Sequence, residues 1–269
     1  MRKLLIFLVG LLSVAGFVWD CFILFNLNLS IKQWQTFAAA MLIFALTYFI
    51  PLSVLSCYLL KKEKCSLSYF WLSVFAGATV IGSLAGLLNY WLTDLLKTVV
   101  TNQDFLNSWA PSLVPPFAEE SLKLILALIV AYLVGAEKLS AFILIGLGVG
   151  LGFQLSEDYT YVAGSFVEGT VNPVWQAFLR LETAFASHWL LTAMLTGACY
   201  ILFVQKFKPK TYLAYVWLFS PFVLHILWNS PWGDGNVLLK LSLTFVSWFL
   251  FGSLFHYAFT VKLRETVPV

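Results

Sequence analysis

The stretch PPFAEESLKLILALIVAYLV, residues 115–134, reads as a membrane-spanning helix except for three ionisable side chains near its start. Its length matches the roughly 20 residues that a helix needs to cross a bilayer. Two neighbouring carboxylates, Glu119 and Glu120, interrupt it, and Lys123 follows one turn later. Charged groups at membrane depth cost about 3 kcal/mol or more and usually face a bundle interior or a cavity. This stretch therefore indicates both a membrane protein and the position of its functional site.

The composition of the whole chain also indicates an integral membrane protein. Hydrophobic residues make up 61% of the 269 residues and charged residues only 11%, whereas a soluble domain carries about 25% charged residues. The net charge of +3 arises from basic residues in short loops, so no nucleic-acid partner is expected. The cysteines show no metal-ligand spacing and predict no disulfide framework: Cys21, Cys57, Cys65 and Cys199.

Eight apolar stretches are long enough to cross a bilayer. They cover residues 4–26, 37–60, 67–92, 112–134, 141–163, 180–204, 211–231 and 237–259. The mixed segment 93–111 is predicted to lie at the membrane interface or to form an external loop. The first stretch could be a signal peptide, but its apolar run is longer than a usual signal core, which favours an uncleaved span. We predict an all-α polytopic membrane helix bundle that forms a single domain over residues 1–269.

The placement of lysine and arginine predicts the orientation of the bundle, because such residues concentrate in cytoplasmic loops. With the N-terminus in the cytoplasm, only Lys32 and Lys97 fall in outer segments. The cytoplasmic segments then carry eleven basic residues: Arg2, Lys3, Lys61, Lys62, Lys64, Lys138, Lys206, Lys208, Lys210, Lys262 and Arg264. Both termini are therefore predicted to be cytoplasmic.

This orientation gives the depth of the polar residues within the spans. At the helical rise of 1.5 Å per residue, Glu119 and Glu157 lie about 10 Å below the outer ends of their helices. By the same estimate His188 lies about 12 Å and His225 about 9 Å below the outer ends of theirs. Four separate helices thus bring carboxylates and imidazoles to one depth in the outer half of the membrane. We predict that they form one site, within a catalytic four-helix core over residues 112–231.

Two features near this site have structural explanations. Glu119 and Lys123 are four residues apart, in the order that favours an ion pair, which would neutralise one carboxylate of the doublet and leave the other. Glycines at 146, 148, 150 and 152 give overlapping GxxxG spacing, which predicts close packing of the fifth span against a neighbour. A gap beside this glycine-rich span is the predicted path of substrate access.

Other polar neighbours leave alternatives open. Asn229 shares a helix face with His225, and a hydrogen bond between helices explains it as well as a role at the site. Arg180 near the outer end of its span can equally be a headgroup anchor. Asp158 follows Glu157, but a helix turns consecutive residues about 100° apart, so only Glu157 is expected to face the site.

The residue types suit hydrolysis of an amide or ester. Two histidines with two or three carboxylates match the ligands of a zinc ion that keeps a position for water, and a further glutamate can take a proton from that water. The soluble signature HExxH is absent, so any metal site must be assembled from several helices. Without metal, one glutamate would activate water while His225 and Asn229 donate hydrogen bonds to a developing oxyanion. The number of histidines and glutamates leans towards metal.

Four motifs, in order along residues 115–230, resemble those of the PrsW-type intramembrane proteases, which are related to the CAAX-type prenyl proteases. They are EESLK (119–123), FQLSE (153–157), RLETAFASH (180–188) followed by Gly197, and HILWN (225–229). CAAX-type relatives carry EExxxR and a histidine in the second motif, so Lys123 and Glu157 favour the PrsW branch. Asp158 departs from the family pattern, in which Asn commonly stands at this position.

The resemblance implies a multi-pass protease of the cell membrane, the plasma membrane of a prokaryote. It would cut a membrane-anchored protein, typically an anti-sigma factor, near the extracytoplasmic face. The resemblance implies that Glu119 and Glu120 supply the activating base and that Lys123 orients them or balances their charge. It implies that Glu157, His188 and His225 bind zinc or water, and that Asn229 has a supporting role.

Three alternatives to a zinc protease stay open. A CAAX-type glutamate protease would act without metal. A proton-coupled transporter also uses intramembrane Glu and His, but cytoplasmic halves such as LILALIVAYLV (124–134) are apolar and offer no inward path. A non-catalytic scaffold could keep the same pocket to bind a transmembrane helix.

Overall fold

A computed structural model describes residues 1–169, 171–205 and 211–265, without the side chains of 211 and 259–265. Lys206, Lys208 and Lys210, which the predicted orientation uses, lie outside the described residues, as do the side chains of Lys262 and Arg264. Within the described ranges the chain contains helices and no strand, so the predicted all-α class is confirmed.

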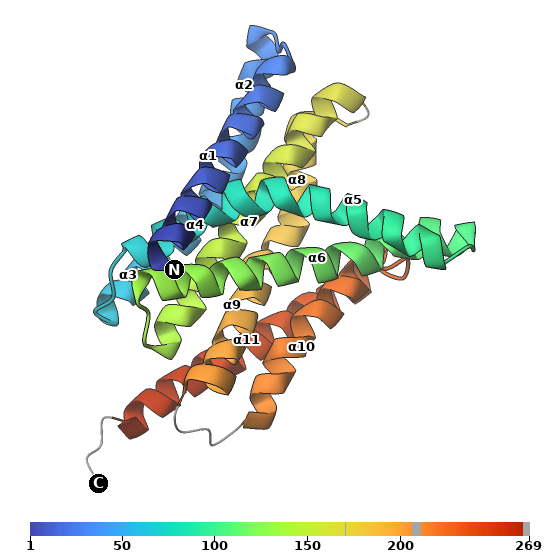
Figure 1. Ribbon diagram of the computed structural model, residues 1–269. Helices are drawn as coiled ribbons and strands as arrows, with labels where there is room; N and C mark the ends of the chain where they lie inside the picture. The colour runs from blue at the N-terminus through green and yellow to red at the C-terminus, as the bar shows by residue number, and fades with distance from the viewer. Residues whose placement is uncertain (170, 206–210, 266–269) are drawn as a thin grey trace.

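In the part of the chain that the structure describes, eight helical segments follow one another, and their order agrees with the eight predicted stretches (Figure 1). They are α1 (Arg2–Asn26); α2 (Ile31–Phe44), continued by the π-helical turn η1 (Ala45–Phe49) into α3 (Ile50–Lys62); α4 (Ser68–Ala76), continued by η2 (Gly77–Ile81) into α5 (Gly82–Val99); α6 (Gln103–Val134); α7 (Leu139–Glu168); α8 (Pro173–Ala184) followed by α9 (His188–Cys199) with η3 (Tyr200–Val204); α10 (Thr211–Trp228); and α11 (Val237–Glu265).

Six of these segments in the described part of the chain are long and apolar enough to cross a membrane. They are Arg2–Asn26, Ile31–Lys62, Ser68–Val99, Leu139–Glu168, Pro173–Val204 and Val237–Ala258. A further apolar helix, Tyr212–Trp228, is shorter. Helix α6 has sufficient length, but its charged doublet and Lys123 interrupt its apolar run. The chain is a multi-pass membrane protein.

The segment 93–111 does not form the external loop that was one of its two predicted forms. Helix α5 extends to Val99 and α6 begins at Gln103, so only three residues separate the two helices. Asn102 caps α6, because its side-chain oxygen accepts a hydrogen bond from the backbone N–H of Phe105 at 2.9 Å. The polar residues that suggested a loop thus lie on two long helices that pack against each other.

Helix α7 is the central helix, enclosed between α4 and α9 (Figure 1). A Cβ atom at Gly150 would lie 2.2 Å from the His188 carbonyl oxygen of α9, and one at Gly152 would lie 2.0 Å from the Val74 carbonyl oxygen of α4. The predicted close packing of the glycine-rich stretch is therefore confirmed. These glycines leave no gap towards α4 or α9, and the path of substrate access stays a prediction.

Candidate active site inside the helix bundle

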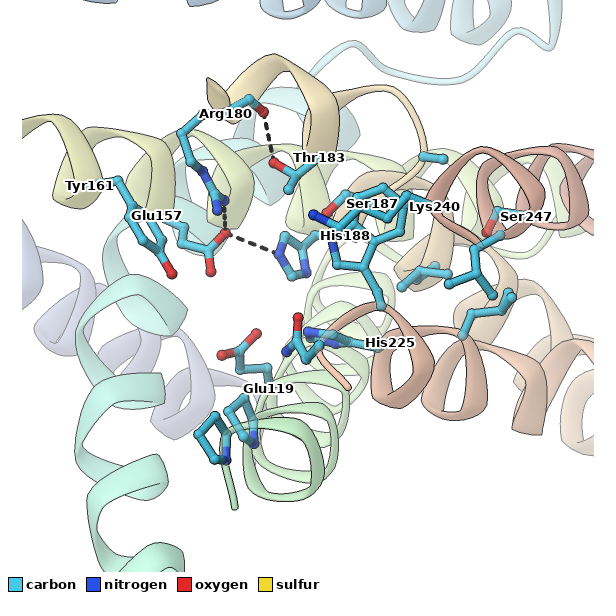
Figure 2. A pocket seen from close by; sticks show the side chains of 18 of the residues that line it. Glu119, Glu157, Tyr161, Arg180, Thr183, Ser187, His188, His225, Lys240 and Ser247 are labelled. Carbon is cyan, nitrogen blue, oxygen red and sulfur yellow. Dashed lines mark hydrogen bonds and ion pairs between the residues drawn. The ribbon is translucent and has the colours of Figure 1, made fainter. Parts of the chain in front are cut away.

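A cavity of about 500 Å³ lies among the helices, and Figure 2 shows the side chains that line it. Its wall includes Glu119 of α6, Glu157 of α7, His188 of α9 and His225 of α10. The residues that the sequence placed at one depth therefore meet in space. They come together because α7, packed tightly against α9, carries Glu157 to the start of α9, where His188 is the first residue.

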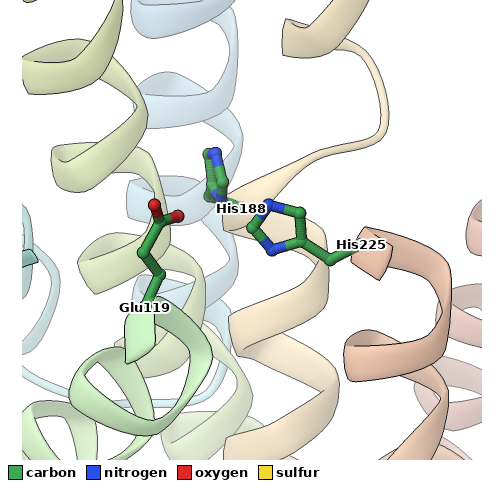
Figure 3. A group of neighbouring side chains, drawn as sticks. All are labelled: Glu119, His188 and His225. Carbon is green, nitrogen blue, oxygen red and sulfur yellow. The ribbon is translucent and has the colours of Figure 1, made fainter. Parts of the chain in front are cut away.

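Glu119, His188 and His225 form a compact group of potential metal ligands. One ligand atom from each residue lies within 4.8 Å of those of the other two, and Figure 3 shows the carboxylate directed towards the two imidazoles. All three residues are buried, with 5%, 4% and 7% of their surface exposed. The two rings pack edge to face, with their centroids 5.2 Å apart.

The Glu119 carboxylate is only partly satisfied. Its Oε1 atom accepts a hydrogen bond from Asn89 Nδ2 of α5 at 3.1 Å. Its Oε2 atom is buried and has no hydrogen-bond partner among the described residues. A buried carboxylate oxygen without a partner is costly, and a cation removes that cost. A carboxylate and two imidazoles are also the donor set that zinc takes in catalytic sites. The residues present therefore fit a zinc ion.

Lys123 forms its shorter ion pair with Glu120, not with Glu119 as the spacing suggested. The Nζ atom lies 2.7 Å from Glu120 Oε1 but 4.0 Å from Glu119 Oε2. The side chains of Lys123 and Glu120 are completely buried. Spacings of three and four residues both bring side chains together on a helix. Here Glu119 faces the cavity, so Glu120 is the carboxylate that the lysine neutralises.

Glu120 and Lys123 also hold the two imidazoles from behind. His225 Nδ1 lies 2.9 Å from Glu120 Oε1, and His188 Nδ1 lies 2.6 Å from Lys123 Nζ. A carboxylate at one ring nitrogen fixes the orientation of an imidazole and leaves the other nitrogen for a metal ion, as in many metal sites, and His225 has this arrangement with Glu120. At His188 the Lys123 ammonium is the donor and Nδ1 the acceptor, so this contact orients the ring without following that pattern. Neither Glu120 nor Lys123 lines the cavity itself.

Glu157 lies on the cavity wall beside His188. Its Oε2 atom is 3.2 Å from His188 Nε2 and forms an ion pair with the Arg180 guanidinium (Figure 2). The sequence predicted Glu157 as the carboxylate of the metal site, whereas Glu119 belongs to the compact group. The metal-binding role of Glu157 therefore stays a prediction. Asp158 does not line the cavity; its buried carboxylate accepts hydrogen bonds from Tyr48 and Gln154.

Two residues that the sequence did not assign to the site belong to it. Arg180, left open as a headgroup anchor, bridges Glu157 and Asp158 and lies 4.2 Å from the ring centroid of Tyr161. Its position seven residues after the start of α8 at Pro173 gave no means of choosing between the two interpretations. Asn89 contacts Glu119, and its only signal was a single amide within the apolar stretch LAGLLNYWL.

Asn229 follows the last residue of α10 and lines the cavity. Its backbone oxygen accepts a hydrogen bond from Ser112 Oγ at 2.6 Å, and this bond connects the end of α10 to α6. The predicted role of its side chain stays a prediction.

A buried Glu/His/His group beside a cavity, inside a multi-pass helix bundle, is the arrangement expected of a membrane-embedded hydrolase that binds a metal ion. Residues 66–257, well over half of the chain, match the family model described as PrsW family intramembrane metalloprotease. The chain belongs to this family, and it is a peptidase of the membrane. Searches of curated proteins and of solved structures gave no match.

Proposed function

We propose that the protein hydrolyses a peptide bond of a membrane-anchored protein of the anti-sigma-factor kind, near the extracytoplasmic surface, and that it uses zinc. The observation that carries this proposal is the convergence of Glu119, His188 and His225 within 4.8 Å on the wall of a cavity in the bundle. Family membership supports the reaction class. We propose residues 112–231 as the catalytic core, with Asn89 added from α5.

The outer position of the cavity rests on the proposed orientation, with both termini in the cytoplasm. The start of α1, the connection between α6 and α7 and the end of α11 lie on the left of the bundle, whereas the connection between α10 and α11 lies on the right (Figure 1). This arrangement supports an even number of crossings. The excess of lysine and arginine in the segments on the first side supports its assignment to the cytoplasm.

Glu119, His188 and His225 would hold the zinc ion. When bound, zinc supplies Lewis-acid polarisation of a carbonyl oxygen and of water. Glu120 fixes the His225 ring, and Lys123 fixes the His188 ring while it neutralises Glu120. These buried contacts orient the two histidine side chains, and the hydrogen bond from Asn89 orients Glu119.

The glutamate that takes the proton from the attacking water must reach the cavity, and Glu120 does not. We propose Glu157 for this role, because it lies on the wall next to His188 and its side chain is 23% exposed. The ion pair with Arg180 holds its carboxylate in one position. The same group can return the proton to the leaving amine. Asn229, which also lines the cavity, is the proposed donor to the carbonyl oxygen.

A metal-free mechanism is the second candidate, and one observation favours it. The Oε2 atom of Glu119, which has no hydrogen-bond partner among the described residues, could itself accept the proton from water. The two mechanisms assign different roles to Glu119 and Glu157, so the two residues can be compared directly.

The test combines metal analysis with cleavage of a co-expressed single-span reporter protein. Purified wild-type protein should contain one zinc ion per chain, and E119Q and H188A/H225A should lose it. E157Q should keep zinc and lose cleavage, with each variant at wild-type levels in the membrane. Active wild-type protein without metal would select the glutamate mechanism. Wild-type cleavage by E119Q and E157Q together would exclude the site, and pH-dependent flux through liposomes would instead support the transporter.

A further inference from the structure

Asp158 is a buried carboxylate on α7 that has no part in the proposed reaction. Its surface is 0% exposed, and it does not line the cavity. A carboxylate inside a membrane bundle is costly unless hydrogen-bond donors surround it. An apolar side chain of similar size often fills such a position without loss of stability. The partners of Asp158 therefore indicate what a carboxylate does here.

Side chains from three helical segments donate hydrogen bonds to the Asp158 carboxylate. Its Oδ1 atom accepts one from Arg180 Nε of α8 at 2.6 Å and one from Gln154 Nε2 of α7 at 3.0 Å. Its Oδ2 atom accepts one from the Tyr48 hydroxyl at 2.9 Å. Tyr48 is 4% exposed and lies in the π-helical turn η1. Because both oxygens are bound, the plane of the carboxylate is fixed.

The Arg180 guanidinium contacts two carboxylates along one edge. Its Nε atom donates to Asp158, and its Nη2 atom donates to Glu157 (Figure 2 shows the contact with Glu157). The guanidinium is planar and holds these two donors in a rigid fork. The ring of Tyr161 lies against its face, with the centroid 4.2 Å from Arg180 Cζ. The bond at Nε therefore determines where Nη2 lies and where it holds Glu157.

Glu157 needs this restraint because its side chain is 23% exposed on the cavity wall. Glutamate and arginine both have many rotamers, and the guanidinium offers five N–H donors. Without the bond at Nε, the guanidinium could turn and present another nitrogen, which would move the Glu157 carboxylate. In the structure, Glu157 Oε2 also lies 3.2 Å from His188 Nε2, a contact that depends on that position.

We propose that Asp158 and Tyr48 are positioning residues for Glu157. Tyr48 fixes the Asp158 carboxylate, which fixes the Arg180 guanidinium. Arg180 in turn holds Glu157 at the cavity wall beside His188. Asp158 and Tyr48 do not line the cavity and act only through Arg180. This inference rests on the proposed function, in which Glu157 takes the proton from water, and it extends the site to η1.

Two substitutions of Asp158 test the hydrogen bond to Arg180. D158L removes the acceptor, whereas D158N keeps a carbonyl oxygen in its place. A misplacement of about 1 Å can cost about 100-fold in rate, so D158L should lower kcat roughly 10–100-fold on the purified single-span reporter. The KM should stay within about two-fold of wild type, because substrate binding is unchanged. D158N should keep kcat within about three-fold, because a neutral acceptor bonds about half as strongly as a carboxylate.

A substitution of Tyr48 tests the far end of this arrangement. Y48F removes only the hydroxyl that donates to Asp158, and the loss of one hydrogen bond should lower kcat about five-fold. Combined with D158L it should cause no further loss, because the acceptor of that hydroxyl is already absent. Y159F is the matched control: the Tyr159 hydroxyl donates at the same distance, 2.9 Å, to the Asp20 backbone oxygen of α1. It should keep the wild-type kcat.

The outcomes separate this inference from the proposed function. Wild-type cleavage by E157Q would exclude Glu157 as the proton acceptor, and the positioning role would fall with it. If E157Q is inactive while D158L keeps the wild-type kcat, the positioning role is wrong and the protease stands. Equal losses in D158L and D158N would also refute it, as would a further loss when Y48F is added to D158L.

Melting temperatures show whether each variant folds. D158L leaves Arg180 and Glu157 as a one-to-one ion pair, so no charge is left uncompensated and the fold should persist. If D158L nevertheless unfolds, the comparison of Y48F with Y159F decides. A fall in kcat of about five-fold in Y48F alone supports the positioning role, and equal kcat values in the two variants refute it.

Discussion

Replacement of Lys123 by methionine tests the charge arrangement behind the site. The Lys123 and Glu120 side chains are completely buried and their charged atoms are 2.7 Å apart. Removing one partner of a buried ion pair typically destabilises a protein by about 3–5 kcal/mol, because the remaining charge is left uncompensated. Glu120 keeps its contact with His225 at 2.9 Å. We therefore expect K123M to lower the free energy of unfolding by about 3 kcal/mol, at the lower end of that range.

A second substitution identifies which carboxylate the lysine neutralises. Adding E120Q to K123M removes the uncompensated charge and should restore at least about 2 kcal/mol, as expected for residues in direct contact. Adding E119Q should restore less than about 0.5 kcal/mol. Its carboxylate is 4.0 Å from the ammonium and has Asn89 as a separate partner.

The measurement is reversible unfolding in mixed micelles titrated with sodium dodecyl sulfate, followed by circular dichroism. All variants are compared with wild-type protein in the same detergent. Equal recovery by E119Q and E120Q, or larger recovery by E119Q, would refute the assignment of Glu120 as the partner. Stability of K123M within about 0.5 kcal/mol of wild type would refute the buried pair as a whole.

Two further predictions concern the support of the proposed metal ligands. Asn89 donates a hydrogen bond to Glu119, so N89L should weaken zinc affinity about 10–100-fold, and N89Q, which keeps an amide donor, should recover part of that loss. Zinc competition titrations measure the affinity of each variant. Wild-type zinc affinity in N89L would exclude a supporting role for this contact. At Gly150, alanine would place Cβ 2.2 Å from the His188 carbonyl oxygen, so G150A should lose about 1–3 kcal/mol of stability and its zinc. Gly164 on the same helix has nothing within 4 Å, and G164A should match wild-type protein in both measurements.

The sequence predicted the helices well because a long apolar segment in a bilayer can adopt only a helix. Every apolar stretch must satisfy its own backbone hydrogen bonds, and a helix is the way a single segment does so. The eight predicted stretches therefore correspond to the eight helical segments. The error fell on residues 93–111, where Asp94, Lys97 and Asp104 lower the hydropathy although the helices continue through or beyond them.

The meeting of the site residues was also predictable, for a related reason. In a membrane-spanning helix, the number of residues from the helix end gives the depth of a side chain. Charged side chains at membrane depth usually face the interior of the helix bundle. Glu119, Glu157, His188 and His225 have a common predicted depth, and polar groups at that depth were expected to face the interior of one small bundle. With those two restrictions, few arrangements keep them apart.

Sequence alone predicted a helical membrane bundle in which one group of acidic and histidine side chains comes together, and the structure brings these residues to one cavity. Only the tertiary structure decided the contacts within that group: Lys123 with Glu120, Glu119 with the two histidines, and Arg180 with Glu157. The physical reason is that spacing fixes depth along a helix axis, whereas contacts also depend on each helix's rotation and tilt. Those are set by packing between helices, as at Gly150 against α9.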